Sequence, residues 1–149
     1  MKIGLITSPG GHLFQLYQLE KWWKKYDRFW VTKKSEDVRH LLKKEKVFYG
    51  FFPENRNLLN STRNLILSIK ILIRERPNIL ISTGASIAVP FFYVAKILGC
   101  KLIYMETYDF IEYPTLSAKL VSPIVDLLLV QNEIQKKYFK KAVFWGATL

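Results

Sequence analysis

Short apolar segments alternate with longer segments of helical periodicity along the chain, and this alternation limits the fold more than any other feature. It is typical of a parallel sheet covered by helices. The runs Ile79-Leu80-Ile81 and Leu127–Val130 are apolar throughout, as strands buried on both faces usually are. We therefore predict a single Rossmann-like α/β domain over residues 1–149, with a mostly parallel sheet and helices on both faces.

The predicted elements follow one another with short connections. The strands are Lys2–Thr7, Arg28–Thr32, Lys46–Phe51, Asn78–Ser82, Lys101–Glu106, Asp126–Val130 and Ala142–Trp145. The helices are Leu13–Lys25, Glu36–Lys44, Leu58–Arg74, Ile87–Leu98, Leu116–Ser122 and Glu133–Phe139. The more mixed strands near residues 28 and 46 are expected at the edges of the sheet. Ligands of such sheets bind beyond the carboxyl ends of the strands, so the loops there are the candidate sites.

The first of these loops, Ser8 to His12, contains two consecutive glycines before a helix. Backbone N–H groups at Gly10 and Gly11 can approach an anion at the positive end of that helix, which predicts a phosphate or diphosphate ligand. A tight turn that needs glycine is the alternative, because neither the dinucleotide-binding nor the P-loop spacing is present. His12 is predicted to bind a phosphate oxygen or to accept a proton from an attacking hydroxyl, unless it only caps or packs.

The second loop, Ser82-Thr83-Gly84-Ala85, repeats the arrangement after the fourth predicted strand. Its hydroxyls and glycine make it the second part of the predicted anion site. Glu106 ends the next strand and is expected to project into the same crevice. There it is predicted to orient a sugar hydroxyl or His12, or to cap the turn at Thr107.

The chain is both basic and apolar. Its 23 Lys and Arg residues against 12 Asp and Glu give a net charge of +11, which favours an anionic partner. Half of the residues are apolar and 15% are aromatic, which favours a membrane surface over nucleic acid. The helix from Leu58 carries more apolar residues than one buried stripe requires, although a deeply buried helix is the alternative. The residues predicted to contact the membrane are Leu58, Arg63, Ile66, Lys70, Ile73 and Arg74.

Other features of the sequence limit location and chemistry. No stretch reaches the roughly 18 to 20 apolar residues of a spanning helix, and the first residues do not form a secretory signal. A single cysteine, Cys100, allows no internal disulfide. We expect a cytoplasmic protein, peripheral on the inner face of the plasma membrane. Cys100 is expected in the core and His40 on the surface, and no metal site, nucleophilic triad or cofactor of this chain's own is predicted.

Several ordered motifs resemble one family. They are Ser8-Pro9-Gly10-Gly11-His12-Leu13, Asp27-Arg28-Phe29-Trp30-Val31-Thr32, Asn55-Arg56-Asn57-Leu58, Ser82-Thr83-Gly84-Ala85, Val89-Pro90-Phe91-Phe92, Pro114 to Val121 and Val130-Gln131. Together they resemble the bacterial capsule and exopolysaccharide proteins of the PssD and EpsE type. These are relatives of the membrane-anchor subunit of the eukaryotic dolichol-pathway N-acetylglucosaminyltransferase.

The resemblance implies the amino-terminal half of a GT-B glycosyltransferase, similar to that of MurG. That half faces the membrane and a polyprenyl-diphosphate-linked acceptor, while a separate partner chain holds the UDP-sugar donor. On this basis the two glycine loops would hold the acceptor diphosphate, and His12 and Glu106 would assist the acceptor hydroxyl. Many relatives place an arginine four residues after the glutamate, where this chain has Phe110. The chain is expected to take part in sugar transfer only with its partner.

Two other functions remain open from the residues themselves. A stand-alone Rossmann-like nucleotide-binding enzyme needs an acidic residue after the second strand to hold a ribose. Glu36 and Asp37 are nearby, but they have the pattern of a helix start. A basic nucleic-acid-binding module is favoured by charge alone, since no helix-turn-helix, RRM or KH signature is present.

Overall fold

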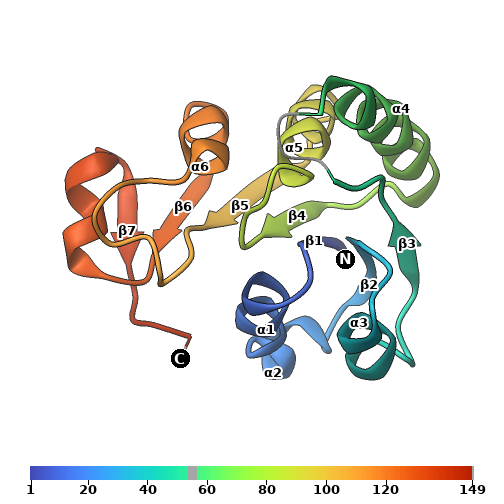
Figure 1. Cartoon of the computed structure of the whole chain (residues 1–149), viewed down its shortest axis with the longest axis horizontal. Helices are drawn as coiled ribbons and strands as arrows, with labels where there is room; N and C mark the ends of the chain where they lie inside the picture. The colour runs from blue at the N-terminus through green and yellow to red at the C-terminus, as the bar shows by residue number, and fades with distance from the viewer. Residues whose placement is uncertain (54–56, 149) are drawn as a thin grey trace.

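A computed structural model describes residues 1–53 and 57–148 and shows one seven-stranded parallel sheet in the order β3-β2-β1-β4-β5-β6-β7 (Figure 1). Asn55 and Arg56, part of one family-like motif, lie outside the described residues. The strands are β1 Lys2–Ile6, β2 Asp27–Thr32, β3 Val47–Tyr49, β4 Ile79–Ser82, β5 Lys101–Met105, β6 Leu127–Val130 and β7 Ala142–Phe144. All seven predicted strands are present, which confirms the Rossmann-like α/β fold.

The helices differ from the prediction in two places. They are α1 Gly11–Tyr17, α2 Glu20–Trp23, α3 Glu36–Leu41, α4 Leu58–Glu75, α5 Ala88–Ile97 and α6 Leu116–Val121, with a 3₁₀ helix, η1, at Glu133–Tyr138. The single helix predicted over residues 13–25 is wrong, because the helix is interrupted near Leu19, between the end of α1 and the start of α2. The break lets the Trp23 indole donate to the Leu16 carbonyl and places its ring edge-on to Trp30 at 5.3 Å.

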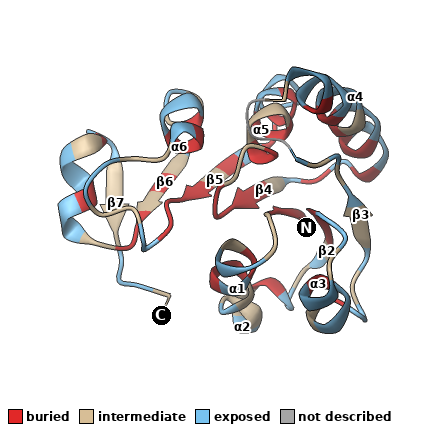
Figure 2. Ribbon diagram, viewed as in Figure 1, coloured by how far each residue is buried: buried red, intermediate tan, exposed pale blue. Residues whose placement is uncertain are grey.

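Side chains from alternate positions of each strand enter two separate cores. Leu5, Trp30 and Ile81 pack with α1, α2 and α3 on one face of the sheet. Ile6 and Leu80 pack with α4, α5 and α6 on the other. Figure 2 shows the buried residues along the central strands and along the inner sides of the helices. Burial on both faces explains why the central strands are apolar without alternation.

The prediction that the strand near residue 28 lies at an edge is wrong. β2 lies between β1 and β3, and the outer strands are β3 and β7. Phe29 and Val31 are fully buried, so the charged residues that made this segment look mixed lie at its amino end. There the Arg28 guanidinium binds both carboxylate oxygens of Glu45, at 2.7 and 2.8 Å. A polar strand start is therefore not a sign of an edge strand.

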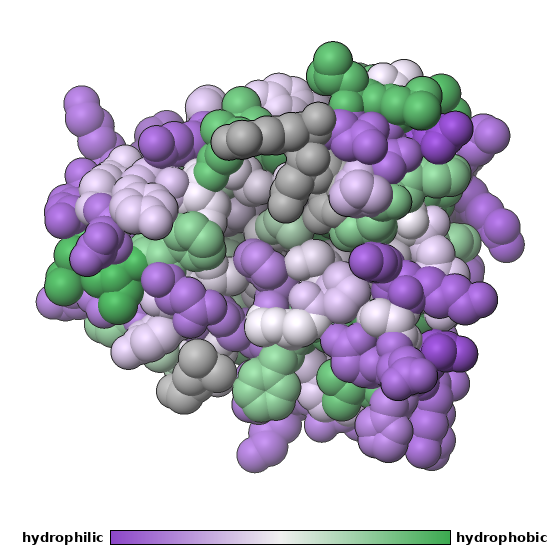
Figure 3. Space-filling view, viewed as in Figure 1, coloured by the Kyte–Doolittle hydropathy of each residue, from purple (hydrophilic) through white to green (hydrophobic). Residues whose placement is uncertain are grey.

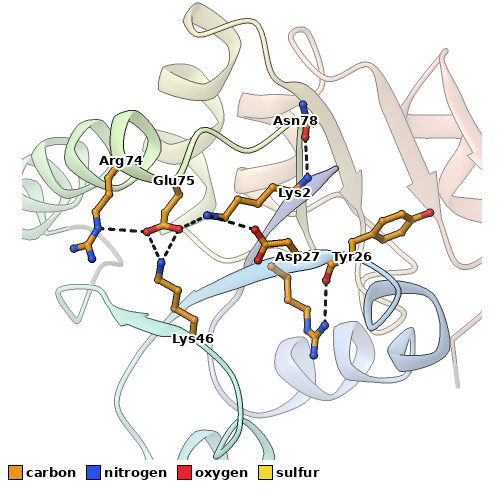
Figure 4. Close-up of polar contacts among 8 residues, drawn as sticks. Lys2, Tyr26, Asp27, Lys46, Arg74, Glu75 and Asn78 are labelled. Carbon is orange, nitrogen blue, oxygen red and sulfur yellow. Dashed lines mark hydrogen bonds and ion pairs between the residues drawn. The ribbon is translucent and has the colours of Figure 1, made fainter.

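A charged cluster joins the amino ends of the first three strands to the end of α4 (Figure 4). The Glu75 carboxylate is 2% exposed and accepts hydrogen bonds from Lys2 at 2.6 Å and Lys46 at 2.7 Å. Asp27 and Arg74 complete the cluster at longer distances. Burial acts to raise the pKa of Glu75, but the two lysines outweigh it and the pKa is lowered.

Replacing Glu75 with glutamine is expected to destabilise the fold by ~1–2 kcal/mol at neutral pH. The folded pKa lies below the ordinary value of 4.5, so the contribution of the carboxylate is complete above pH 4.5 and is lost as the pH falls through the folded pKa. Urea unfolding of both proteins between pH 7 and pH 3 measures this. A gap between wild type and variant that stays constant over that range would contradict the ion-pair assignment.

Candidate functional site

The two glycine loops meet at the point where the order of the sheet reverses. β1 and β4 are neighbours, yet β1 leads into α1 on one face and β4 leads into α5 on the other. In open α/β sheets this switch point leaves a crevice beyond the strand ends in which ligands bind. The predicted adjacency of the Ser8–His12 and Ser82–Ala85 loops is therefore confirmed.

His12 connects the two loops directly. Its Nδ1 lies 2.9 Å from the Thr83 carbonyl oxygen, and the Thr83 hydroxyl donates to the His12 carbonyl at 2.7 Å. A carbonyl oxygen only accepts, so Nδ1 carries the proton in this contact. In the neutral ring Nε2 then has the free lone pair, and it has no hydrogen-bond partner among the described residues. His12 is only partly buried, so Nε2 can act as a base toward a ligand.

Gly84 allows the close approach that this contact needs. Its φ is +115°, and a Cβ at this position would lie 3.1 Å from the His12 ring and 3.0 Å from the Tyr104 hydroxyl. The next residue, Ala85, also has a positive φ, of +70°. Non-glycine residues in this region are strained, and such residues are enriched at binding sites. The loop thus requires glycine because both its backbone angle and its neighbours exclude a side chain.

The hydroxyls of the second loop are used inside the protein. Ser82 accepts from the Gly84 N–H at 3.0 Å and donates to the Gly84 carbonyl at 3.2 Å, and its side chain is fully buried. Thr83 bonds His12 and lies 3.2 Å from the Thr7 hydroxyl. These two side chains therefore shape the loop, and direct binding through their hydroxyls is not what the structure shows.

Asp37 occupies one amide of the first loop, which the sequence did not indicate. The Gly10 N–H donates to Asp37 Oδ2 at 3.0 Å. This donor is therefore taken, and the carboxylate would repel an anion placed beside it. Asp37 is the second residue of α3, and the sequence had indicated it only as part of a helix start or as an acid near a ribose.

Glu106 adopts the capping arrangement rather than projecting into an open crevice. Its side chain is 1% exposed, and Oε1 accepts from the Thr107 N–H at 3.2 Å. Oε2 accepts from the Thr115 hydroxyl at 3.0 Å, and Thr115 in turn caps α6 by accepting from the Ala118 N–H. Burial raises the pKa of Glu106, against the lowering effect of these hydrogen bonds. Within the described part of the chain the Glu106 carboxylate forms no hydrogen bond with His12, and it instead holds the start of α6.

Three buried glutamines, Gln15, Gln131 and Gln135, hold the loop that follows Glu106, and only Gln131 was indicated in advance, as part of the Val130-Gln131 motif. Gln131 donates to Gln15 and to the Glu106 carbonyl, and its Oε1 accepts from the N–H and hydroxyl of Thr148 at 2.9 and 2.6 Å. Gln135 donates to the Thr107 carbonyl at 2.8 Å. The network ties α1, the loop after β5 and the C-terminal tail together.

Helix α4 buries polar residues and exposes apolar ones. The side chains of Asn60, Asn64, Ser68 and Glu75 lie on its buried face together with Ile71 and Leu72. Asn64 forms two hydrogen bonds with the Phe51 backbone, at 2.8 and 2.9 Å, so its polar group is satisfied.

The outward face carries the predicted membrane residues. Leu58, Ile66 and Ile73 are 87%, 51% and 54% exposed, and Arg63, Lys70 and Arg74 are exposed among them. Figure 3 shows hydrophobic surface gathered at the upper edge of the molecule, in the region of α4 and beside hydrophilic surface. The alternative of a deeply buried α4 is wrong. An exposed apolar face of this kind marks an interaction surface.

Residues 1–53 and 57–148 contain neither a helix that could span a membrane nor a metal-binding cluster of side chains. No helix in them combines the length and apolar character needed to cross a bilayer. No group of three or more His, Cys, Asp or Glu side chains in this part of the chain is arranged to hold a metal ion. Cys100 is buried and His40 is exposed, as predicted.

Comparison with known proteins gives the family. Residues 6–148 match the family described as "Oligosaccharide biosynthesis protein Alg14 like". The chain belongs to the Alg14-like family. It is 27% identical to the UDP-N-acetylglucosamine transferase subunit ALG14 of Debaryomyces hansenii over 97% of this chain and 75% of that protein.

A second relative matches half of the Alg14-like chain. It is the UDP-N-acetylglucosamine–N-acetylmuramyl-(pentapeptide) pyrophosphoryl-undecaprenol N-acetylglucosamine transferase of Caldanaerobacter subterraneus, 37% identical over 49% of this chain and 19% of that enzyme. Among solved structures, MurG of Acinetobacter baumannii superimposes on the whole chain with a TM-score of 0.78 at 13% identity. A UDP-GlcNAc 2-epimerase of Methanocaldococcus jannaschii superimposes on 99% of it with a TM-score of 0.73 at 16% identity.

These structural neighbours establish the fold and leave the chemistry open. The chain spans 46% of the length of the MurG structure and the same share of the epimerase structure. A likeness at 13–16% identity shows a shared Rossmann-like architecture of the GT-B kind and carries no activity by itself.

Proposed function

We propose that this Alg14-like chain is the acceptor-binding and membrane-docking subunit of a two-component glycosyltransferase. A separate partner chain would bind the UDP-sugar, and the sugar would pass to a polyprenyl-diphosphate-linked saccharide in capsule or exopolysaccharide synthesis. The observation that carries the proposal is the outward face of α4, which exposes apolar residues while polar residues are buried on the inner face. This helix lies on the same side of the sheet as α5, which follows one of the glycine loops. Similarity to a UDP-N-acetylglucosamine transferase subunit supports the reaction class and suggests UDP-GlcNAc as the first donor to test.

The residues at the switch point suit an acceptor carrying a diphosphate. The amides of Gly11, His12 and Ala85 lie on the two loops that His12 and Thr83 hold together. Backbone N–H groups at helix starts bind phosphate oxygens well. His12 Nε2, on the open side of the ring, would accept the proton of the acceptor hydroxyl as it attacks the sugar. Glu106 is assigned a positioning role, because its carboxylate reaches only Thr107 and Thr115.

The test is to express the chain with and without a candidate donor-binding partner encoded beside it. Co-purification and transfer from UDP-GlcNAc to a polyprenyl-diphosphate acceptor are measured for each chain and for the pair. We expect a stable pair whose activity far exceeds that of either chain. Nucleotide-sugar binding or transfer by this chain alone, with no association, would instead favour the stand-alone enzyme.

Removing two cations from the outer face of α4 is expected to weaken binding to anionic vesicles. Each Lys or Arg near such a surface contributes about 1 kcal/mol, so the double change Lys70→Gln and Arg74→Gln should lower the partition constant by about 30-fold. Sedimentation with phosphatidylglycerol vesicles measures it. The matched control removes two exposed lysines near β7, Lys140→Gln and Lys141→Gln, and should have a much smaller effect. Equal losses in both variants would show that net charge, and not this face, drives the binding.

A further inference from the structure

A groove of about 590 Å³ runs between α4, α5 and α6, on the side of the molecule that carries the exposed apolar face. Its walls are mainly apolar and come from all three helices, with Leu58 and Leu65 on α4, Val89, Pro90 and Tyr93 on α5, and Leu120 on α6. This size is typical of a pocket for a small or elongated ligand. The packing of the fold does not fill this space.

One end of the groove reaches the candidate site. Ser86, which lines it, directly follows Ala85 of the second glycine loop. Ser117, which also lines it, follows the Thr115 cap that is bonded to Glu106. A ligand in the groove would thus have one end beside the loops that are proposed to hold a diphosphate.

The open side of the groove continues into the exposed apolar surface. Leu58 is shared by the groove and by the outer face of α4, and Leu116 on α6 is 71% exposed beside it. A surface that docks on a bilayer through such residues opens the groove toward the hydrocarbon region. Chains held in the membrane can enter the groove without crossing water.

The charges around the groove favour a ligand that is apolar with an anionic head. No acidic residue is among the described residues that line it. Within the described helix α4 the one acidic residue, Glu75, is buried and paired with lysines. Arg63 on α4 follows the lining residue Thr62, Lys119 on α6 precedes the lining residue Leu120, and both cations are exposed. An apolar groove with cations beside it suits a hydrocarbon chain that ends in a diphosphate.

We propose that this groove binds the isoprenoid chain next to the diphosphate of the lipid-linked acceptor. This inference rests on the proposed function, because it names the lipid part of the same substrate. The isoprenoid would lie between α4, α5 and α6, and its diphosphate would lie at the Ser86 end of the groove, beside the glycine loops. The groove then fixes the direction in which the acceptor sugar enters the crevice, so that the reacting hydroxyl faces His12.

The test measures direct binding to the full chain by isothermal titration, without partner or transfer. The probes are inorganic diphosphate, geranyl diphosphate and geranylgeranyl diphosphate. All three are titrated in the same detergent, below its critical micelle concentration. Because apolar contact grows with chain length, we expect geranylgeranyl diphosphate to bind at least tenfold more tightly than geranyl diphosphate. Ser61→Trp, which places an indole in the groove, should abolish this difference and leave inorganic diphosphate binding unchanged.

The control is Ser61→Ala at the same exposed position, which removes the same hydroxyl bond to the Asn57 carbonyl without filling the groove. It should retain the dependence on chain length. Affinity that is independent of chain length in the wild-type protein, or unchanged in Ser61→Trp, would overturn the proposal, as would equally tight binding of a short-chain phosphatidylglycerol. Failure of sugar transfer with every partner would count against the proposed function alone, since this titration needs no transfer.

Discussion

Replacing His12 with asparagine is expected to lower the rate of sugar transfer by this chain and its partner by about 10²- to 10⁴-fold, the usual contribution of a positioned general base. Asparagine keeps an N–H that can reach the Thr83 carbonyl, where the His12 Nδ1 now donates at 2.9 Å. It has no nitrogen lone pair in place of Nε2. The variant therefore separates the two roles of the histidine, which are to join the loops and to accept a proton.

Steady-state kinetics with saturating UDP-GlcNAc and a varied acceptor measure the effect. The loss is expected in kcat, with little change in KM, because the amides that bind the diphosphate remain in place. His40→Asn, at an exposed position on α3, is the matched control and should be fully active. Full activity of His12→Asn would exclude proton transfer by this residue, while a rise in KM alone would assign it to acceptor binding.

The positions of the two loops could be predicted because they depend only on periodicity and topology. The apolar runs identify the strands, and the right-handed connection of parallel strands brings the ends of β1 and β4 to one edge. The glycine at position 84 indicated a backbone angle that other residues rarely adopt, and the structure has a positive φ there. What the sequence did not give was the partner of each polar group. The carboxylate of Asp37 lies 27 positions from Gly10 in the chain, yet it takes that amide.

The role of α4 shows a second limit of the sequence. Its apolar residues are spread around more than one face, so periodicity could not decide which side is buried. The structure places Asn60 and Asn64 inward because the backbone of the loop after β3 needs hydrogen-bond partners there. Once these amides are buried, the leucines and isoleucines of the opposite face are exposed. The inward face is thus set by tertiary hydrogen bonding, which overrides the hydrophobic preference of each position.

Replacing Gln131 with leucine is expected to destabilise the protein by ~3 kcal/mol, and to lower its melting temperature by about 6–12 °C. The side chain is 2% exposed and makes four hydrogen bonds, to Gln15, to the Glu106 carbonyl and to two groups of Thr148. Leucine has a similar volume but removes this partner from the Glu106 carbonyl and from Thr148, while Gln15 keeps only the Tyr108 N–H, at 3.4 Å. A buried polar group that loses its only partner costs ~1–3 kcal/mol, which sets the expected size.

The matched control is Gln18→Leu, the same change at an exposed position after α1, for which thermal and urea unfolding should show a change within ~0.5 kcal/mol. Gln15→Leu and the double variant complete a cycle with Gln131→Leu. Because the two amides bond each other, the double variant should cost less than the sum of the single ones by at least ~0.5 kcal/mol. Additive losses would mean that the glutamines stabilise the loop after β5 independently. Coupled losses, joined to reduced transfer activity, would show that this buried network holds Glu106 and the start of α6 in the arrangement on which both the candidate site and the groove depend.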